Sequence, residues 1–289
     1  MNPEEAYDAI RRVISADPQK RIVDSSFDAM SFGNFWVTFD DNGQRKSIVN
    51  DRGELVLDGQ TAMLSMYEVD EPTIMKVRAI LEYKKVEYKR VNPLGRTMVA
   101  IRRRGRIGKV PAIEFDGEMV IDSTDIAYEL ERRFPQRPIV PEGERERALC
   151  HALEDWADES LYFIGLYYRW HEQRGRRPVS AAFGKKLTGK LAYRFYLRRI
   201  LNQIKGQGTL RKPPEHVMRD LSRHLDAVET LVDPGPYLLG DAPYLCDFAL
   251  WGQLNYLRRT PVGGGAIAGR RSIEQYMARM AQPGSNAGI

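Results

Sequence analysis

The spacing of apolar and polar residues follows two different patterns along this chain, and one pattern replaces the other near residue 140. Before it, short apolar runs bounded by Asp, Asn and Gly predict strands mixed with a few amphipathic helices. After it, apolar residues recur at spacings of three and four, which predicts helices. The pattern therefore predicts an α+β chain with an all-helical second half.

The first part, residues 1–60, predicts a small α+β module of its own. A helix over Glu4 to Ile14 would carry Ala6, Ile10, Val13 and Ile14 on one face. Strands joined by tight turns are then expected at Asn34 to Phe39, Lys46 to Val49 and Glu54 to Leu57. This is a helix packed on a β-meander. Because the stretch contains neither His nor Cys, we expect docking or scaffolding here and not catalysis.

Residues 61–140 predict the order strand, helix, strand, hairpin, helix. The expected elements are Met63 to Val69, Pro72 to Glu82, Val86 to Val91, two hairpin strands that end at Phe115 and Ile121, and a final helix to Phe134. The hairpin turns at Asp116-Gly117, a pair that is typical of tight β-turns. Ser123 or Thr124 is the expected N-cap of the final helix, which stops before Pro135.

Residues 141–289 predict helices throughout. They are expected at Glu144 to Tyr168, Leu187 to Ile204, Glu215 to Leu231, Leu245 to Leu257 and Ser272 to Met280. The first of them would turn an apolar stripe toward a core, formed by Leu149, Leu153, Trp156, Leu161 and Ile164. The run Gly263-Gly264-Gly265 lies between helices, and we expect a flexible connection there.

Composition narrows the class of protein. A chain of 289 residues with 43% apolar residues is long enough for two or three domains with a sizeable core. Cys150 and Cys246 form no Cys-x-x-Cys pair, and the 4 histidines lack metal-ligand spacing, so neither a dithiol centre nor a metal site is expected. No apolar run approaches the roughly 20 residues that span a bilayer. We expect a cytoplasmic protein.

The net charge of +5 is modest, but the basic residues are bunched. One bunch consists of Arg96, Arg102, Arg103, Arg104, Arg106 and Lys109, in what looks like an Arg-rich insertion between a strand and the hairpin. A second runs from Arg174 to Lys212 with almost no carboxylates. Two interpretations stay open: solvated Arg-rich helices and loops, or patches that attract an anionic partner such as nucleic acid, acidic lipid or an acidic substrate.

Particular residues in this order of elements resemble a known family. They are Val110-Pro111 before the hairpin, Asp122-Ser123 after it, and Lys76-Val77-Arg78 in the first helix of the domain. Together they resemble the glutathione transferase-like superfamily, in which a thioredoxin-like α/β domain precedes an all-α domain. The stretch 240–250, where Asp247 would cap a central helix, resembles the helical domain of that family.

The stretches 154–159, 206–211 and 248–254 are similar to a bacterial branch that shares features with the metaxins. The resemblance covers about residues 63–282. It implies a thioredoxin-like glutathione-binding domain at 61–140 and a helical C-terminal domain at 141–289, preceded by the appended module.

The resemblance implies glutathione as co-substrate. Its binding residues would be Lys109, Val110, Pro111, Asp122 and Ser123. Val110 would pair with the cysteinyl backbone, next to a cis Pro111. Ser123 and the helix start would hold the γ-glutamyl carboxylate, and Asp122 would face the ammonium.

Activation of the thiol is a separate question. Relatives often place Ser or Cys where this chain has Glu71, preceded by Asp70, and two carboxylates beside the sulfur would raise the pKa of the thiol. Thr73 or Tyr67 is the candidate catalytic hydroxyl. Tyr162, Tyr168 and Tyr193 are candidates for the lining of an apolar pocket.

The expected protein is thus a glutathione transferase-type enzyme that joins glutathione to an apolar small molecule or removes it from one. The alternative is a metaxin-like binding or scaffold protein whose thiol-activating position has degenerated, as Asp70 and Glu71 suggest. Family members are often dimers, so a homodimer is a further expectation.

Overall fold

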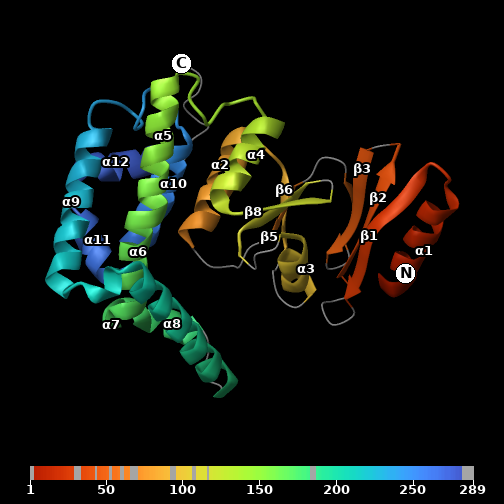
Figure 1. Cartoon of the computed structure of the whole chain (residues 1–289), viewed down its shortest axis with the longest axis horizontal. Coiled ribbons are helices and arrows are strands. Elements are labelled where there is room, and N and C mark those ends of the chain that lie inside the picture. Colours follow the sequence, from red (N-terminus) through yellow and green to blue (C-terminus); the bar gives the residue numbers. More distant parts are fainter. Residues whose placement is uncertain are drawn as a thin grey trace. The chain divides into compact units, whose positions relative to one another are not determined.

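The computed structural model describes residues 3–28, 34–42, 44–51, 54–58, 62–65, 71–91, 96–105, 109–115, 117–182 and 187–281. The chain divides into two compact units, Met1–Glu68 with Lys85–Leu130, and Val69–Lys84 with Glu131–Ile289. Helices dominate, and the described strands form two four-stranded sheets, which confirms the α+β class (Figure 1). The domain boundaries near residues 60 and 140 stay a prediction.

The first unit begins with the predicted helix on a β-meander. The helix α1 (Pro3–Ala16) packs against the first two of four antiparallel strands that follow in chain order (Figure 1). The strands are β1 (Lys20–Asp28), β2 (Asn34–Asp41), β3 (Gln44–Asp51) and β4 (Glu54–Asp58). The sequence missed β1, because an irregularity between Ile22 and Asp24 interrupts the alternation of inward and outward residues.

The core of this module confirms most of the expected helical face. Ala6 and Ile14 are buried against the inward side chains of β2, which are Phe35, Val37 and Phe39. Val13 was wrongly placed on that face: it is 72% exposed. Tyr7 takes its place, with its ring centroid 5.4 Å from that of Phe35.

The second sheet has the strand order β6-β5-β7-β8. The strand β5 (Ala62–Ser65) pairs in parallel with β6 (Tyr88–Val91) and antiparallel with β7 (Ala112–Phe115). The hairpin partner of β7 is β8 (Glu118–Ile121), and α4 (Ser123–Arg133) follows it. The crossover between β5 and β6 contains α2 (Pro72–Lys84). This is the predicted thioredoxin-like order of elements.

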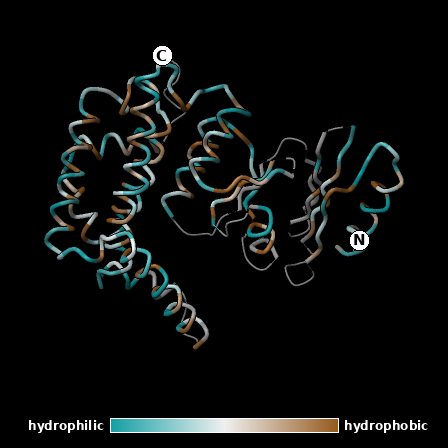
Figure 2. Tube along the Cα trace, in the orientation of Figure 1, coloured by the Kyte–Doolittle hydropathy of each residue, from teal (hydrophilic) through white to brown (hydrophobic). Residues whose placement is uncertain are grey.

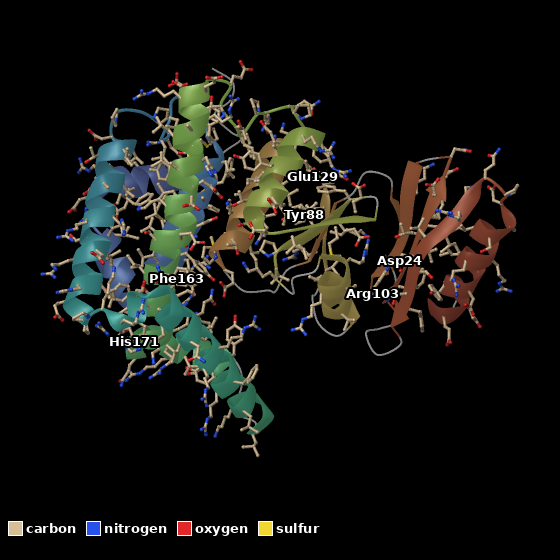
Figure 3. All side chains as sticks on the ribbon, in the orientation of Figure 1. Asp24, Tyr88, Arg103, Glu129, Phe163 and His171 are labelled. Atoms are coloured by element: carbon tan, nitrogen blue, oxygen red, sulfur yellow. The ribbon has the colours of Figure 1, made fainter. Side chains whose placement is uncertain are left out.

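The basic segment before the hairpin contains a helix, α3 (Arg96–Gly105). Ile101 is fully buried with Ala112 and Ile121, so α3 contributes to the core. Arg104 donates to both carboxylate oxygens of Glu114, at 3.0 and 3.1 Å. Its guanidinium also lies 3.6 Å from Asp24 of β1. Arg102 and Arg103 remain exposed, and Figure 3 labels Arg103 on α3.

The second unit contains α2 and the C-terminal helices. Its first long helical segment runs through α5 (Glu144–Trp156), η1 (Ala157–Leu161), α6 (Tyr162–Leu166) and η2 (Tyr167–His171), where η1 and η2 are π-helical turns. These turns shift the inward face along the segment. Leu161 and Ile164 are buried as expected, but Leu149 is 43% exposed and Cys150 is buried in its place.

The remaining helices match the predicted ones in order and add two. They are α7 (Gln173–Ala182), α8 (Leu187–Gln207), α9 (Pro214–Val232), α10 (Leu245–Arg258), α11 (Pro261–Ile267) and α12 (Arg271–Met280), with a short turn η3 (Thr209–Arg211). No helix within the described ranges is long and apolar enough to cross a membrane.

The Gly263-Gly264-Gly265 run lies inside α11, so the expected flexible connection was wrong. The Thr260 side chain caps this helix by accepting the Gly263 N–H at 3.0 Å. A Cβ atom on Gly263 would lie 2.4 Å from the Leu257 carbonyl oxygen. Close contact between α10 and α11 therefore requires glycine there, and the loss of helix propensity is offset by the cap and by packing.

A buried charge cluster fastens α2 to the helical unit. The Lys76 ammonium, 1% exposed, donates to Glu154 and, at 2.7 Å, to Asp158. Gln253 of α10 donates to the other oxygen of Asp158 at 2.9 Å. Burial alone would lower the pKa of Lys76, but the charges of Asp158 and Glu154 outweigh it and raise that pKa. The ammonium is therefore charged and paired.

Close backbone contact brings α2 and α10 together at the same place. A Cβ atom on Gly252 would lie 2.7 Å from the Pro72 carbonyl oxygen and 3.6 Å from the Lys76 nitrogen. On the same pair of helices, Tyr83 and Phe248 have ring centroids 5.4 Å apart. The missing side chain of Gly252 thus lets α2 approach α10 closely enough for the charge cluster to form.

Asp247 has the expected structural role at the start of α10. Its carboxylate accepts the backbone N–H groups of Tyr244 and Leu238, each at 2.9 Å, and the Tyr276 hydroxyl at 3.1 Å. It is fully buried, and burial raises its pKa to about 6 despite these donors. The sequence motif therefore identified a helix cap correctly.

We predict that Lys76→Met lowers the free energy of unfolding by about 3–5 kcal/mol, because it leaves two carboxylates buried without their cation. Urea unfolding followed by helical circular dichroism measures this. The matched control is Lys212→Met, whose ammonium lies 2.7 Å from Asp220 in an exposed pair, and which should cost no more than about 1 kcal/mol. Equal losses in the two variants would contradict the role of the buried cluster.

Candidate functional site

The candidate site lies where the β7–β8 hairpin meets α4. Ala112 pairs with Ile121, so the residues just beyond this pair, Pro111 and Asp122, come next to each other. The Val110–Pro111 peptide bond is cis, as the resemblance implied. Pro111 is buried, whereas Val110 is half-buried and Lys109 is exposed. The hairpin thereby joins two sequence motifs that are separated by ten residues.

Asp122 is the N-cap of α4, in place of the Ser123 or Thr124 that we expected. Its side-chain oxygen accepts the Thr124 N–H at 3.1 Å, and its carbonyl oxygen accepts the Ile126 N–H at 2.9 Å. Its φ of 89° is uncommon for a residue with a side chain. Such a conformation marks a position that the surrounding structure holds in place, and it is often found at ligand sites.

Ser123 is the first residue of α4 and is 6% exposed. No residue in the described part of the chain donates to or accepts from its hydroxyl. The first N–H groups of a helix also have no partner within the helix, and they carry partial positive charge. This corner can therefore bind a carboxylate through backbone N–H groups and one hydroxyl, with the second oxygen of Asp122 beside them for a cation.

The candidate catalytic residues are less well defined. Thr73 is half-buried in the first turn of α2, a helix that belongs to the second unit. Tyr67 and Asp70 lie outside the described residues. The structure thus brings Lys109, Val110, Pro111, Asp122 and Ser123 together in the first unit, and the activating role of Thr73 or Tyr67 stays a prediction.

Glu71 has an environment that the sequence did not reveal. It directly precedes α2, and its carbonyl oxygen accepts the Met75 N–H at 3.0 Å. Burial raises the pKa of its carboxyl to about 7, and the positive charge of Arg169 opposes this shift only in part. Part of the Glu71 carboxyl is therefore protonated near neutral pH.

Two tyrosines of the second unit lie within electrostatic range of this carboxyl. Burial, with the charge of Glu71 adding to it, raises the pKa of both Tyr162 and Tyr256. The Tyr256 hydroxyl accepts the Trp170 indole N–H at 3.0 Å, and the Arg169 guanidinium lies 5.4 Å from the Tyr256 ring centroid. Sequence reasoning identified Tyr162 but not Arg169 or Tyr256, because the sequence does not show that π-turn η2 and α10 approach the start of α2.

The other two tyrosines proposed for an apolar pocket have different surroundings. Tyr168 is 4% exposed, and its hydroxyl contacts the Met218 sulfur at 3.9 Å, as expected of a core residue. Tyr193 is half-buried and lines a surface hollow together with Arg176 and Leu197. Of the three, Tyr162 is the one whose pKa the charge of Glu71 raises.

Two domain families match this chain. The glutathione S-transferase N-terminal domain matches residues 68–138, and the glutathione S-transferase C-terminal domain matches residues 197–279. The first match contains the cis-proline and Asp122-Ser123 corner together with Glu71 and Thr73. The second contains Gly252, Gln253 and Asp247.

Known proteins similar to the chain point the same way. The isoprene-epoxide–glutathione S-transferase of Rhodococcus sp. (strain AD45) is 26% identical over 182 residues, which are 60% of this chain and 76% of that protein. The glutathione transferase GSTFuA3 of Phanerochaete chrysosporium has a similar fold, with a TM-score of 0.59, 17% identity, and 78% and 97% of the two chains covered. A glutathione S-transferase of Methylobacillus flagellatus, solved with glutathione bound, has a TM-score of 0.53, 18% identity, and 77% and 95% covered.

We predict that Glu71 makes stability depend on pH. Because its folded-state pKa of about 7 lies above the ordinary value of 4.5, the folded state favours the protonated form, and stability falls as pH rises between these values. Relative to Glu71→Gln, the wild-type chain should lose roughly 1–3 kcal/mol between pH 4.5 and pH 8. We place the expected loss toward the lower end, because the side chain is only half-buried.

Urea unfolding of both proteins at pH 5 and pH 8 measures the difference. Glu82→Gln, at an exposed position of α2, serves as the control: it keeps Glu71, so its stability should change with pH as that of the wild-type chain does. If the stability of the wild-type chain changed with pH in the same way as that of Glu71→Gln, Glu71 would not have a raised pKa.

Proposed function

Because the chain belongs to the glutathione transferase-like superfamily, we propose that it binds glutathione at the corner formed by Lys109, Val110, Pro111, Asp122 and Ser123. The observation that carries this proposal is the register of the hairpin, which sets the strand end at 110–111 beside the helix start at 122–123. A strand end and a helix start together supply the main-chain donors and acceptors that a tripeptide needs.

Each part of glutathione has a partner of matching chemistry at this corner. The N–H and C=O of Val110 pair with the cysteinyl backbone as a further strand would. The α4 N-terminus and the Ser123 hydroxyl hold the γ-glutamyl carboxylate. The free oxygen of Asp122 faces the ammonium, and the exposed Lys109 adds a positive charge for a carboxylate.

The proposed reaction joins the glutathione sulfur to an apolar electrophile. The thiol gives up its proton, the thiolate attacks an electrophilic carbon, and a carbon–sulfur bond forms as the bond to the leaving atom breaks. With an epoxide, the ring C–O bond breaks and its oxygen takes up a proton. The Rhodococcus relative is named for an isoprene epoxide, so an epoxide is a suitable first test electrophile.

A hydroxyl near the sulfur lowers the pKa of the thiol by donating to the thiolate. We propose Thr73 or Tyr67 for this role. The raised pKa of Glu71 is compatible with this role, because a carboxyl that is partly neutral at pH 7 repels a thiolate less than a fully ionised one. Removal of glutathione from a conjugate would use the same corner: the thiolate of a second glutathione attacks the conjugate's sulfur, glutathione disulfide forms, the carbon–sulfur bond breaks and the carbon takes up a proton.

We predict that Ser123→Ala weakens glutathione binding by at least about fivefold, because it removes a nearly buried hydroxyl that donates to a carboxylate. Isothermal titration calorimetry of the full chain measures the dissociation constant. The matched control, Ser272→Ala, removes a hydroxyl from the first turn of α12, and it should bind glutathione as the wild type does. An unchanged dissociation constant for Ser123→Ala would remove the assignment.

We further predict that Thr73→Val lowers kcat for conjugation of an epoxide by at least about tenfold and leaves glutathione affinity unchanged, because a donor to developing charge acts mainly on the chemical step. Thr230→Val, an exposed threonine of α9, is the control. If Thr73→Val keeps full activity, Tyr67→Phe is the variant that must lose it. Glutathione binding without conjugation of any tested electrophile would support the scaffold alternative.

A further inference from the structure

The helix α8 carries three large apolar side chains on its outer surface. Leu187 is 73% exposed, Leu191 is 55% exposed and Phe195 is 74% exposed. Their spacing of four residues places them in one row along the helix. Three such residues in a row are more than the single exposed apolar side chains that are normal on a protein surface.

A second row on the same helix is basic. Lys190, Arg194 and Arg198 each follow one of the apolar residues by three positions, and all three are exposed. The two rows therefore lie next to each other on one face, which we name the outer face of α8. Figure 2 shows hydrophobic and hydrophilic positions in close succession along this helix. The sequence from 173 to 212 contains no Asp or Glu, so no carboxylate within that stretch neutralises the row.

The opposite face holds α8 on the helical unit. Ile200 and Ile204 are 7% and 0% exposed. The rings of Tyr196 and Trp170 have centroids 5.2 Å apart. Because this face is buried in the core, the outer face has a fixed orientation. The first part of α8 extends beyond the other helices of its unit (Figure 1).

From these observations we propose that the outer face of α8 docks the protein on an anionic lipid membrane. The helix would lie in the plane of the surface, with Leu187, Leu191 and Phe195 entering the boundary between headgroups and acyl chains. Lys190, Arg194 and Arg198 would pair with lipid phosphates and carboxylates. A basic row beside an apolar row is the combination of side chains that binds an anionic membrane surface.

Other occupants fit the outer face less well. A nucleic acid would use the basic row, but its phosphates make no use of three exposed aliphatic and aromatic side chains in a row. A second copy of the chain docked through the same face would bring two basic rows together and would be repelled. Both remain outcomes that the test below distinguishes.

The test measures binding of the full chain to vesicles by co-flotation. We expect binding to vesicles of 70% phosphatidylcholine and 30% phosphatidylserine, and at least tenfold weaker binding to pure phosphatidylcholine. The double variant Leu191→Ser with Phe195→Ser should lose at least tenfold in affinity for the anionic vesicles. The triple variant Lys190→Gln, Arg194→Gln and Arg198→Gln should lose at least as much.

Matched controls separate docking by α8 from general attraction of a basic protein. Val13→Ser removes an exposed apolar side chain from α1, where the residue is 72% exposed. The triple variant Arg102→Gln, Arg103→Gln and Arg223→Gln removes the same charge from exposed positions elsewhere. Both should bind anionic vesicles within about twofold of the wild type. Circular dichroism should report a wild-type fold for all four variants, because every changed residue is exposed.

Three results would overturn the proposal. One is wild-type vesicle binding by the Leu191→Ser, Phe195→Ser variant, and another is an equal loss in the charge control. The third is that the α8 variants lose binding to a nucleic-acid oligomer, or change the oligomeric state measured by light scattering, and keep their binding to vesicles. Glutathione titration of the α8 variants should match the wild type, so a failure of membrane docking is distinguishable from a failure of glutathione binding.

Discussion

The paired burial of Lys76 is the constraint on which the second unit depends. An ammonium group without exposure to water must be matched by charge, and the two carboxylates that match it come from the α5–η1 segment. The cluster therefore ties a helix from the thioredoxin-like part of the sequence to the C-terminal helices, and α2 belongs to the same compact unit as they do. Gln253 extends the cluster to α10, and its own side-chain oxygen is buried without a partner in the described part of the chain.

The sequence predicted those features that depend on local periodicity or on a local motif. The periodicity of apolar residues predicted the meander, the hairpin and most helices. The motif around Asp247 predicted a helix cap, and the structure has that cap. Features that depend on contacts distant in sequence were not predictable. Leu149 was placed on the inward face but is 43% exposed, because burial along α5 depends on how α10 packs against it. The three glycines lie in a helix whose Thr260 cap and close packing on Leu257 the sequence does not show.

The candidate site divides in the same way. Its proposed binding corner is local, because a four-residue hairpin pairing brings both sequence motifs together. Its chemical part is not local. Burial raises the pKa of Glu71, and Arg169, about a hundred residues further along the chain, opposes that shift, so the sequence identified an acidic residue but not its raised pKa.

The close approach at Gly252 has a consequence for how this protein can change over generations. Any side chain there would meet the main chain of α2 at a distance that real Cβ atoms do not adopt, whereas Gly265 has open space around it. Substitutions are therefore tolerated at Gly265 and excluded at Gly252, although the two glycines lie in neighbouring helices. A lineage that replaced Gly252 would have to move α2 outward, and its descendants would then be under pressure to exchange Lys76 for an uncharged residue.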